Sequence, residues 1–97
     1  MKICFDIDGT ICTNTNGDYF NANPLVERIA MINKLASEGH EIIFFTARGS
    51  ETGIDWREIT RSQLENWGLT YTSLFFGKPS ADQYVDDKGI NDLAFFN

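Results

Sequence analysis

Two acidic side chains directly after the first apolar segment of the chain could carry out phosphoryl-transfer chemistry. Asp6 and Asp8 are separated by one residue in the run DIDGT at positions 6–10. A carboxylate can attack a phosphoryl group and form an aspartyl phosphate. A second carboxyl group nearby can protonate the leaving oxygen and later deprotonate the attacking water. Gly9 allows the chain to turn away sharply after the two carboxylates.

Three further polar clusters follow later apolar segments. Thr46 and Arg48 come after the second segment, where a hydroxyl and nearby backbone N–H groups can bind phosphoryl oxygens. Lys78, between a glycine and a proline, offers a point charge that suits phosphate. Asp86 and Asp87 supply hard oxygen ligands, and Mg²⁺ commonly uses one or two carboxylates together with waters and substrate phosphate. Phosphoryl transfer needs a placed nucleophile, charge neutralisation and alignment, and these clusters offer a candidate for each.

The elements that must position these clusters form a strand–helix–strand pattern. Apolar runs predict buried strands at 2–5, 41–45, 72–76 and 83–85. One helix is expected from Pro24 to the residue before Gly39, with Asn23 as its N-cap, and a second at 55–67. This order predicts an α/β fold with a three-layer, Rossmann-like, mainly parallel sheet. Because ligands bind outside the carboxyl ends of such strands, we expect the four clusters at one edge of the sheet.

Length and charge restrict the class of protein. The 97 residues indicate one domain, and the net charge of −6 shows no nucleic-acid footprint. No apolar run approaches the roughly 20 residues of a membrane-spanning helix, and no signal-type segment is evident at the start. We therefore expect a cytoplasmic protein without a membrane partner. In such a compartment Cys4 and Cys12 are expected to be free thiols.

The four clusters together resemble the haloacid dehalogenase (HAD) superfamily of phosphatases. Residues 6–10 match its first motif, Thr46 its second, Lys78 its third and Asp86-Asp87 its fourth, in the order of the family and across nearly the whole chain. The stretches FFTARGS and GKPSADQYVDDK also look like a small subgroup of capsule or polysaccharide biosynthesis phosphatases. The resemblance implies a single HAD-like catalytic domain over residues 1–97.

The resemblance also implies a role for each motif. Asp6 would be the nucleophile and a Mg²⁺ ligand, and Asp8 the general acid/base with its backbone carbonyl on the metal. Asp86 would bind Mg²⁺ directly, and Asp87 directly or through water. The second and third motifs would hold the phosphoryl group.

Other residues of these segments are candidates for contact with the substrate. Gly9 and Thr10 belong to the first motif, and Arg48 could contact the substrate phosphate or a sugar. For Arg48 a surface salt bridge is an equally good interpretation. Trp56 is expected to anchor the core, with a position at the border of the substrate as the alternative.

The chain departs from most relatives in lacking room for a cap domain, both after the first motif and after the second. Two replacements are conceivable. The loop Ile11–Asn23, with Tyr19 and Phe20 near its end, could fold over the site as a flap. Alternatively a homo-oligomer could cover the site, because the apolar residues Leu93, Phe95 and Phe96 have little chain left to bury them.

The function that these observations favour is a Mg²⁺-dependent phosphomonoesterase acting on a small phosphorylated metabolite. A sugar phosphate of surface-polysaccharide biosynthesis is one candidate substrate. A phosphomutase is disfavoured because the missing cap makes it hard to shield the aspartyl phosphate from water. A non-catalytic Mg²⁺-binding or regulatory module is disfavoured because crowded carboxylates without a role would cost stability. In a response-regulator receiver the acceptor Asp follows a later strand, whereas Asp6 follows the first.

Overall fold

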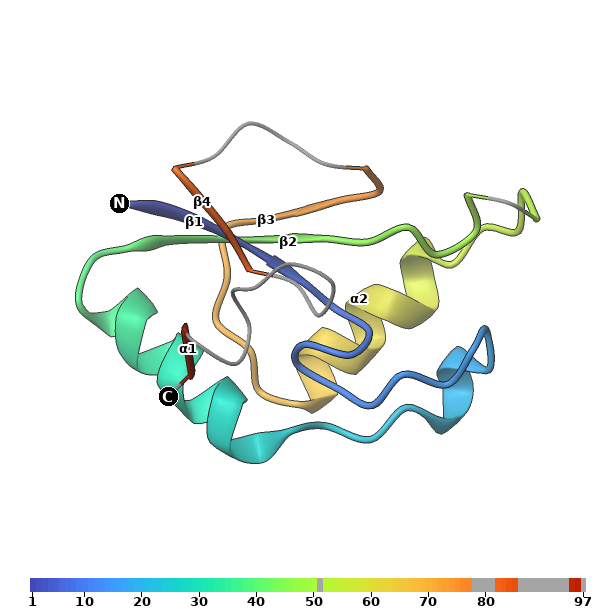
Figure 1. The fold of residues 1–97 in the computed structure, drawn as a ribbon, viewed down its shortest axis with the longest axis horizontal. Coiled ribbons are helices and arrows are strands. Elements are labelled where there is room, and N and C mark those ends of the chain that lie inside the picture. The colour runs from blue at the N-terminus through green and yellow to red at the C-terminus, as the bar shows by residue number, and fades with distance from the viewer. Residues whose placement is uncertain (51, 78–81, 86–94, 97) are drawn as a thin grey trace.

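The computed structural model describes residues 1–50, 52–77, 82–85 and 95–96. Strands and helices alternate along the chain (Figure 1). The elements are β1 (Lys2–Asp6), the 3₁₀ helix η1 (Tyr19–Asn21), α1 (Val26–Ser37), β2 (Glu41–Phe45), α2 (Arg57–Asn66), β3 (Ser73–Phe75) and β4 (Gln83–Val85). The predicted strands at 41–45 and 83–85 are confirmed with their bounds, β1 extends one residue beyond its prediction, and β3 is one residue shorter at each end.

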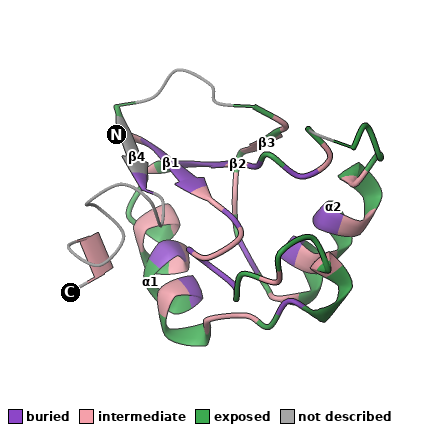
Figure 2. Ribbon diagram, turned by 45° about the vertical axis from the view of Figure 1, so that its right-hand side comes forward, coloured by how far each residue is buried: buried purple, intermediate pink, exposed green. Residues whose placement is uncertain are grey.

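The four strands form one parallel sheet in the order β3-β2-β1-β4. Helix α1 connects β1 to β2, and α2 connects β2 to β3, so both connections move along the sheet in the same direction. Right-handed crossover connections that move in the same direction place their helices on the same face of the sheet. Figures 1 and 2 show α1 and α2 on the same side of the sheet. The α/β fold with a parallel, Rossmann-like sheet is therefore confirmed. The described elements form two layers, and the three-layer arrangement stays a prediction.

The core lies between the sheet and the two helices, and Figure 2 shows buried residues both on the strands and on the two helices. Alternate residues of a strand point to the same face, and paired residues of parallel strands do so too. The main contributors are Ile3 and Phe5 of β1, Ile42 and Phe44 of β2, Ile29 and Ile32 of α1, and Leu64 of α2. This packing fixes the face of each strand and therefore the direction in which the residues after it leave the sheet.

Both helices begin two residues later than the sequence predicted. The N-cap of α1 is Leu25 and not Asn23, because the preceding loop holds this segment in extended form. The Leu25 N–H donates to the Ile11 carbonyl at 2.9 Å, and Pro24 forms a β-bridge with Cys12. These tertiary hydrogen bonds replace the local cap that the sequence suggested.

The last described residues pack onto the core. The rings of Phe95 and Phe96 lie 5.5 and 6.1 Å from the ring of Phe5, and the Arg28 guanidinium lies 4.6 Å from the centre of the Phe96 ring. The expectation that Phe95 and Phe96 lack chain to bury them is therefore wrong. Leu93 lies outside the described residues, and the homo-oligomer stays a prediction.

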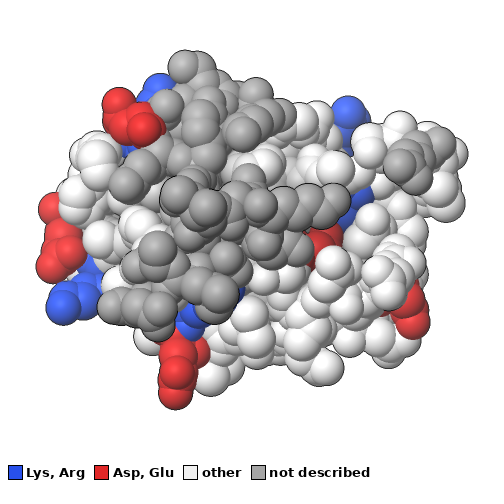
Figure 3. All heavy atoms as spheres, viewed as in Figure 1, with Lys and Arg blue, Asp and Glu red and all other residues white. Residues whose placement is uncertain are grey.

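The surface mixes charges of both signs. On the face in Figure 3, basic and acidic side chains of the described residues lie next to one another and do not form one basic patch. Within the described ranges, no helix has the length and apolar character that a membrane crossing requires.

Candidate active site

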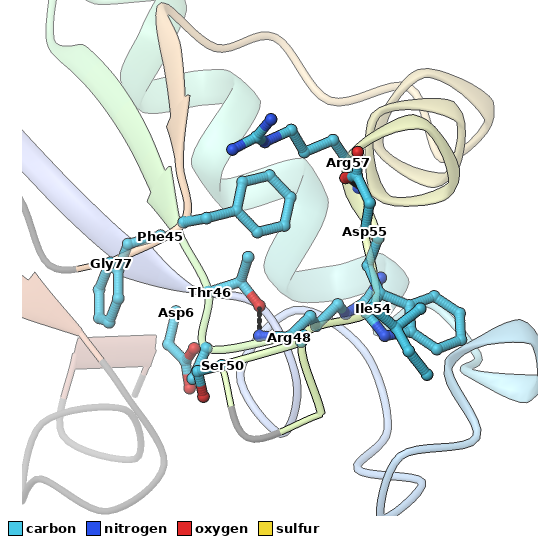
Figure 4. A pocket seen from close by; sticks show the side chains of 14 residues that line it. Asp6, Phe45, Thr46, Arg48, Ser50, Ile54, Asp55, Arg57 and Gly77 are labelled. Carbon is cyan, nitrogen blue, oxygen red and sulfur yellow. Dashed lines mark hydrogen bonds between the residues drawn. The ribbon is translucent and has the colours of Figure 1, made fainter.

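The first two motifs meet where β1 and β2 end. Asp6 is the last residue of β1 and is paired in register with Phe45, so Thr46 leaves β2 beside it. Asp6 and Thr46 line the same cavity of about 630 Å³, which Figure 4 shows at the ends of the strands. The expectation that the first two motifs converge at the carboxyl edge of the sheet is therefore confirmed for these residues.

A second cavity of about 580 Å³ adjoins the first and contains the other acidic residue of the motif. Asp6, Asp8 and Tyr19 line it, and it shares Asp6, Arg48 and Trp56 with the first cavity. The two cavities are therefore neighbouring parts of one groove across the end of the sheet. Trp56 borders this groove and is half-buried, so its position agrees with the alternative that the sequence left open.

Arg48 forms a bidentate ion pair with Asp8. Its Nε donates to Asp8 Oδ2 at 2.9 Å, and its Nη2 donates to Asp8 Oδ1 at 2.8 Å. The Arg48 side chain is completely buried, whereas the Asp8 side chain is 18% exposed. The surface salt bridge that the sequence allowed is therefore a buried ion pair within the groove. In this arrangement the guanidinium contacts Asp8 in place of a substrate.

Residues of α2 and of the first loop hold the Arg48 guanidinium from its other side. Nη1 donates to Thr60 Oγ1 at 3.0 Å and to Gln63 Oε1 at 2.6 Å. Gln63 Nε2 donates in turn to the Tyr19 carbonyl at 2.6 Å. The Tyr19 ring lies 4.5 Å from the guanidinium carbon, and its edge contact with Trp56 joins the rings at 4.9 Å. The loop 11–23 is therefore docked onto the groove through Tyr19.

Cys12 completes the surroundings of Asp8. Its sulfur lies 3.6 Å from both Asp8 Oδ1 and the Ile7 carbonyl oxygen, so these two acceptors share the single S–H donor. Burial raises the pKa of the Cys12 thiol to about 12, and the nearby Asp8 carboxylate adds to the effect. Cys4 and Cys12 are both buried thiols that form no disulfide, as expected. Cys12 therefore stays a neutral thiol at ordinary pH and does not act as a nucleophile.

Gly9 and Thr10 shape the loop and do not line the groove. Gly9 has a φ of 82°, which favours glycine, and its N–H donates to the Cys12 carbonyl at 2.9 Å. Thr10 is completely buried, and its Oγ1 has no hydrogen-bond partner among the described residues. Neither residue lines either cavity, so the structure gives no support to their expected contact with the substrate.

The third and fourth motifs, with Lys78, Asp86 and Asp87, lie outside the described residues. Within the described ranges, no group of three or more His, Cys, Asp or Glu side chains converges as a metal site would require. The expected Mg²⁺ site therefore stays a prediction. β4 does end at Val85, which is paired with Phe5 immediately before Asp6.

The hydrogen bonds that Thr60 and Gln63 make to Arg48 were not foreseen from the sequence. Residues three apart on a helix lie on the same face, so Thr60 and Gln63 lie on one side of α2. No local pattern connects this face to Arg48, which is 12 residues before Thr60 and 15 before Gln63. Only the docking of α2 against the loop after β2 brings these side chains together.

Fold and site together define an α/β protein with an acidic loop at the carboxyl edge of a parallel sheet. Two solved structures share this fold. A structural-genomics target from Vibrio cholerae is 25% identical, with a TM-score of 0.75 over 98% of this chain and 86% of its own. A conserved protein from Bacteroides thetaiotaomicron is 21% identical, with a TM-score of 0.72 over 93% of this chain and 78% of its own. The sequence matches no family model and no curated protein.

Proposed function

We propose that the protein is a Mg²⁺-dependent phosphomonoesterase of the HAD type, with Asp6 as its nucleophile. One observation carries this proposal. Asp6 and Asp8 line the same cavity at the carboxyl edge of the sheet, and Thr46 leaves the neighbouring strand beside Asp6. A nucleophilic carboxylate, a second carboxyl for proton transfer and a hydroxyl for the phosphoryl oxygens are the groups that this reaction requires.

The loop after β2 supplies donors for the phosphoryl group. Thr46 Oγ1 accepts a hydrogen bond from the Arg48 N–H at 3.1 Å, which Figure 4 marks, and this contact fixes the hydroxyl. The hydroxyl proton remains available to a phosphoryl oxygen. Ala47 lines the same groove, and its N–H donates to no other described residue. Asp6 would attack the phosphorus while these two groups hold the equatorial oxygens.

The donor set fits Mg²⁺. Asp6 offers a carboxylate at the edge of the groove, and hard oxygen ligands of this kind are those that Mg²⁺ prefers. The parallel pairing of Val85 with Phe5 supports Asp86 and Asp87 as further ligands, since they follow β4 in the sequence. When bound, the metal would neutralise negative charge on the transferring phosphoryl group.

The groove favours a small phosphorylated substrate whose leaving group has an apolar face. The first cavity is lined beside Asp6 by Phe45, Ile54, Trp56 and Phe76. At about 630 Å³ it has the size of an ordinary small-molecule site. A sugar phosphate has both apolar ring faces and hydroxyls, and it stays the candidate that the sequence suggested.

Phosphate release from a panel of phosphomonoesters, with Mg²⁺ or with EDTA, tests the proposal. Asp6→Asn keeps the shape of the side chain and removes the attacking charge, so we expect turnover to fall by several orders of magnitude while the fold is retained. Glu65→Gln removes an exposed carboxylate from α2 and should leave turnover unchanged. Full activity of Asp6→Asn would contradict the assignment. Mg²⁺ binding without phosphate release would favour the non-catalytic module.

A further inference from the structure

The Arg48 guanidinium is held more firmly than an ordinary ion pair requires. Its N–H groups make four hydrogen bonds, two to Asp8 and one each to Thr60 and Gln63. Its side chain is completely buried. A buried ion pair gives little net stability, because desolvation of the two charges offsets their attraction. The arrangement therefore calls for a role other than stability.

We propose that Arg48 is a positioning residue that orients the Asp8 carboxyl for proton transfer. The inference rests on the proposed phosphatase function and adds a residue to it. A carboxylate offers about four acceptor sites on its two oxygens. Arg48 occupies one on each oxygen, and the Cys12 thiol occupies another on Oδ1. Among the described contacts Oδ2 has no donor other than Arg48 Nε, so this oxygen is the one that can exchange a proton with the substrate.

The ion pair also stabilises the charge that proton transfer creates. As Asp6 attacks, an O–P bond forms, and the bond from phosphorus to the leaving oxygen breaks with its electrons on that oxygen. The proton on Asp8 Oδ2 moves to the leaving oxygen, and its bonding electrons stay on the Asp8 carboxylate. A donor group that is already in place stabilises such developing charge without reorganising during the reaction. The contacts of Arg48 with Thr60 and Gln63 supply this rigidity.

The same contacts join Asp8 to the loop 11–23, which lines the second cavity. Gln63 accepts a hydrogen bond from Arg48 with one end of its amide and donates to the Tyr19 carbonyl with the other. The Tyr19 ring also lies on the guanidinium. Docking of the loop 11–23 and orientation of Asp8 therefore depend on one shared set of contacts.

The dependence of the rate on the leaving group tests this role. p-Nitrophenyl phosphate has a good leaving group that needs little protonation, whereas propyl phosphate needs a proton from Asp8. Proton transfer by a positioned group contributes roughly 10²–10⁴-fold. In Arg48→Lys, which keeps the charge but loses the bidentate geometry, we expect kcat/KM for propyl phosphate to fall at least about 10-fold more than for p-nitrophenyl phosphate. Competitive inhibition by inorganic phosphate should be unchanged, and Arg61→Lys, on the exposed side of α2, should affect neither ester.

A second variant keeps the test decisive if Arg48→Lys does not fold. Thr60→Val preserves the side-chain shape and removes one acceptor of the guanidinium, so it should show the same selective loss at smaller size. Equal losses for both esters, or weaker phosphate inhibition, would overturn the inference in an active enzyme. A rise in activity would also overturn it, because Arg48 would then restrain Asp8. If the wild-type protein releases phosphate from neither ester, the proposed function fails and the inference falls with it.

Discussion

The buried ion pair between Asp8 and Arg48 predicts strongly non-additive stability effects. Asp8→Asn removes the charge that balances a guanidinium whose side chain is completely buried. The remaining contacts of Arg48 are with the neutral oxygens of Thr60 and Gln63. Removing one partner of a buried pair costs about 3–5 kcal/mol. This is a large share of the roughly 5–15 kcal/mol that stabilises an ordinary domain. The melting temperature should therefore fall by at least about 12 °C, at about 4 °C or more per kcal/mol.

The double variant Asp8→Asn/Arg48→Met has no buried charge left. It should be no less stable than Asp8→Asn alone, and its loss should be smaller than the sum of the two single losses by about 1–3 kcal/mol. Urea denaturation measures all four proteins, with equal slopes as the check that the unfolding transitions are comparable. The control is Asp82→Asn combined with Arg48→Met. Asp82 is exposed and accepts from the Lys2 N–H, so the stability losses of these two substitutions should simply add. Additivity of the Asp8 and Arg48 effects within about 0.5 kcal/mol would refute the reasoning.

Three further predictions concern the thiol, the metal and the loop 11–23 that lines the groove. The raised pKa of Cys12, from 9.0 to about 12, means that its contribution to stability is present below pH 9 and is lost as the pH rises toward 12. The loss should reach about 1.4 kcal/mol per pH unit. The urea midpoint of the wild-type protein should therefore fall more between pH 8 and 10.5 than that of Cys12→Ala, which has no thiol to ionise. Millimolar Mg²⁺ should raise the melting temperature relative to EDTA by mass action, and an unchanged value would count against the metal site. Tyr19→Leu loses the contacts with Arg48 and Trp56 and should cost about 1–3 kcal/mol in a melting experiment, whereas Phe20→Ala, at a side chain 67% exposed, should cost less than half of that.

Local patterns in the sequence determined the elements and the place where the site forms. The apolar run at 42–45 forms a strand that lies between β1 and β3 in the sheet. A run of this length is typical of a buried strand and is too short for a helix. The order of strands and helices required a parallel sheet, and parallel strands end at one edge. Asp6 and Thr46 could therefore be placed together from their positions after the first two strands. This part of the prediction depended only on the order of the elements along the chain.

The tertiary structure alone decided which side chains face one another at that edge. Arg48 reaches Asp8 across 40 residues of sequence, and its other partners come from a helix whose face is set by core packing. The start of α1 was shifted for the same reason, since hydrogen bonds from the first loop replaced the local cap at Asn23. Burial explains both results. Once the guanidinium is removed from water its donors must be satisfied by whatever groups the fold brings near, and a one-dimensional pattern does not contain that information.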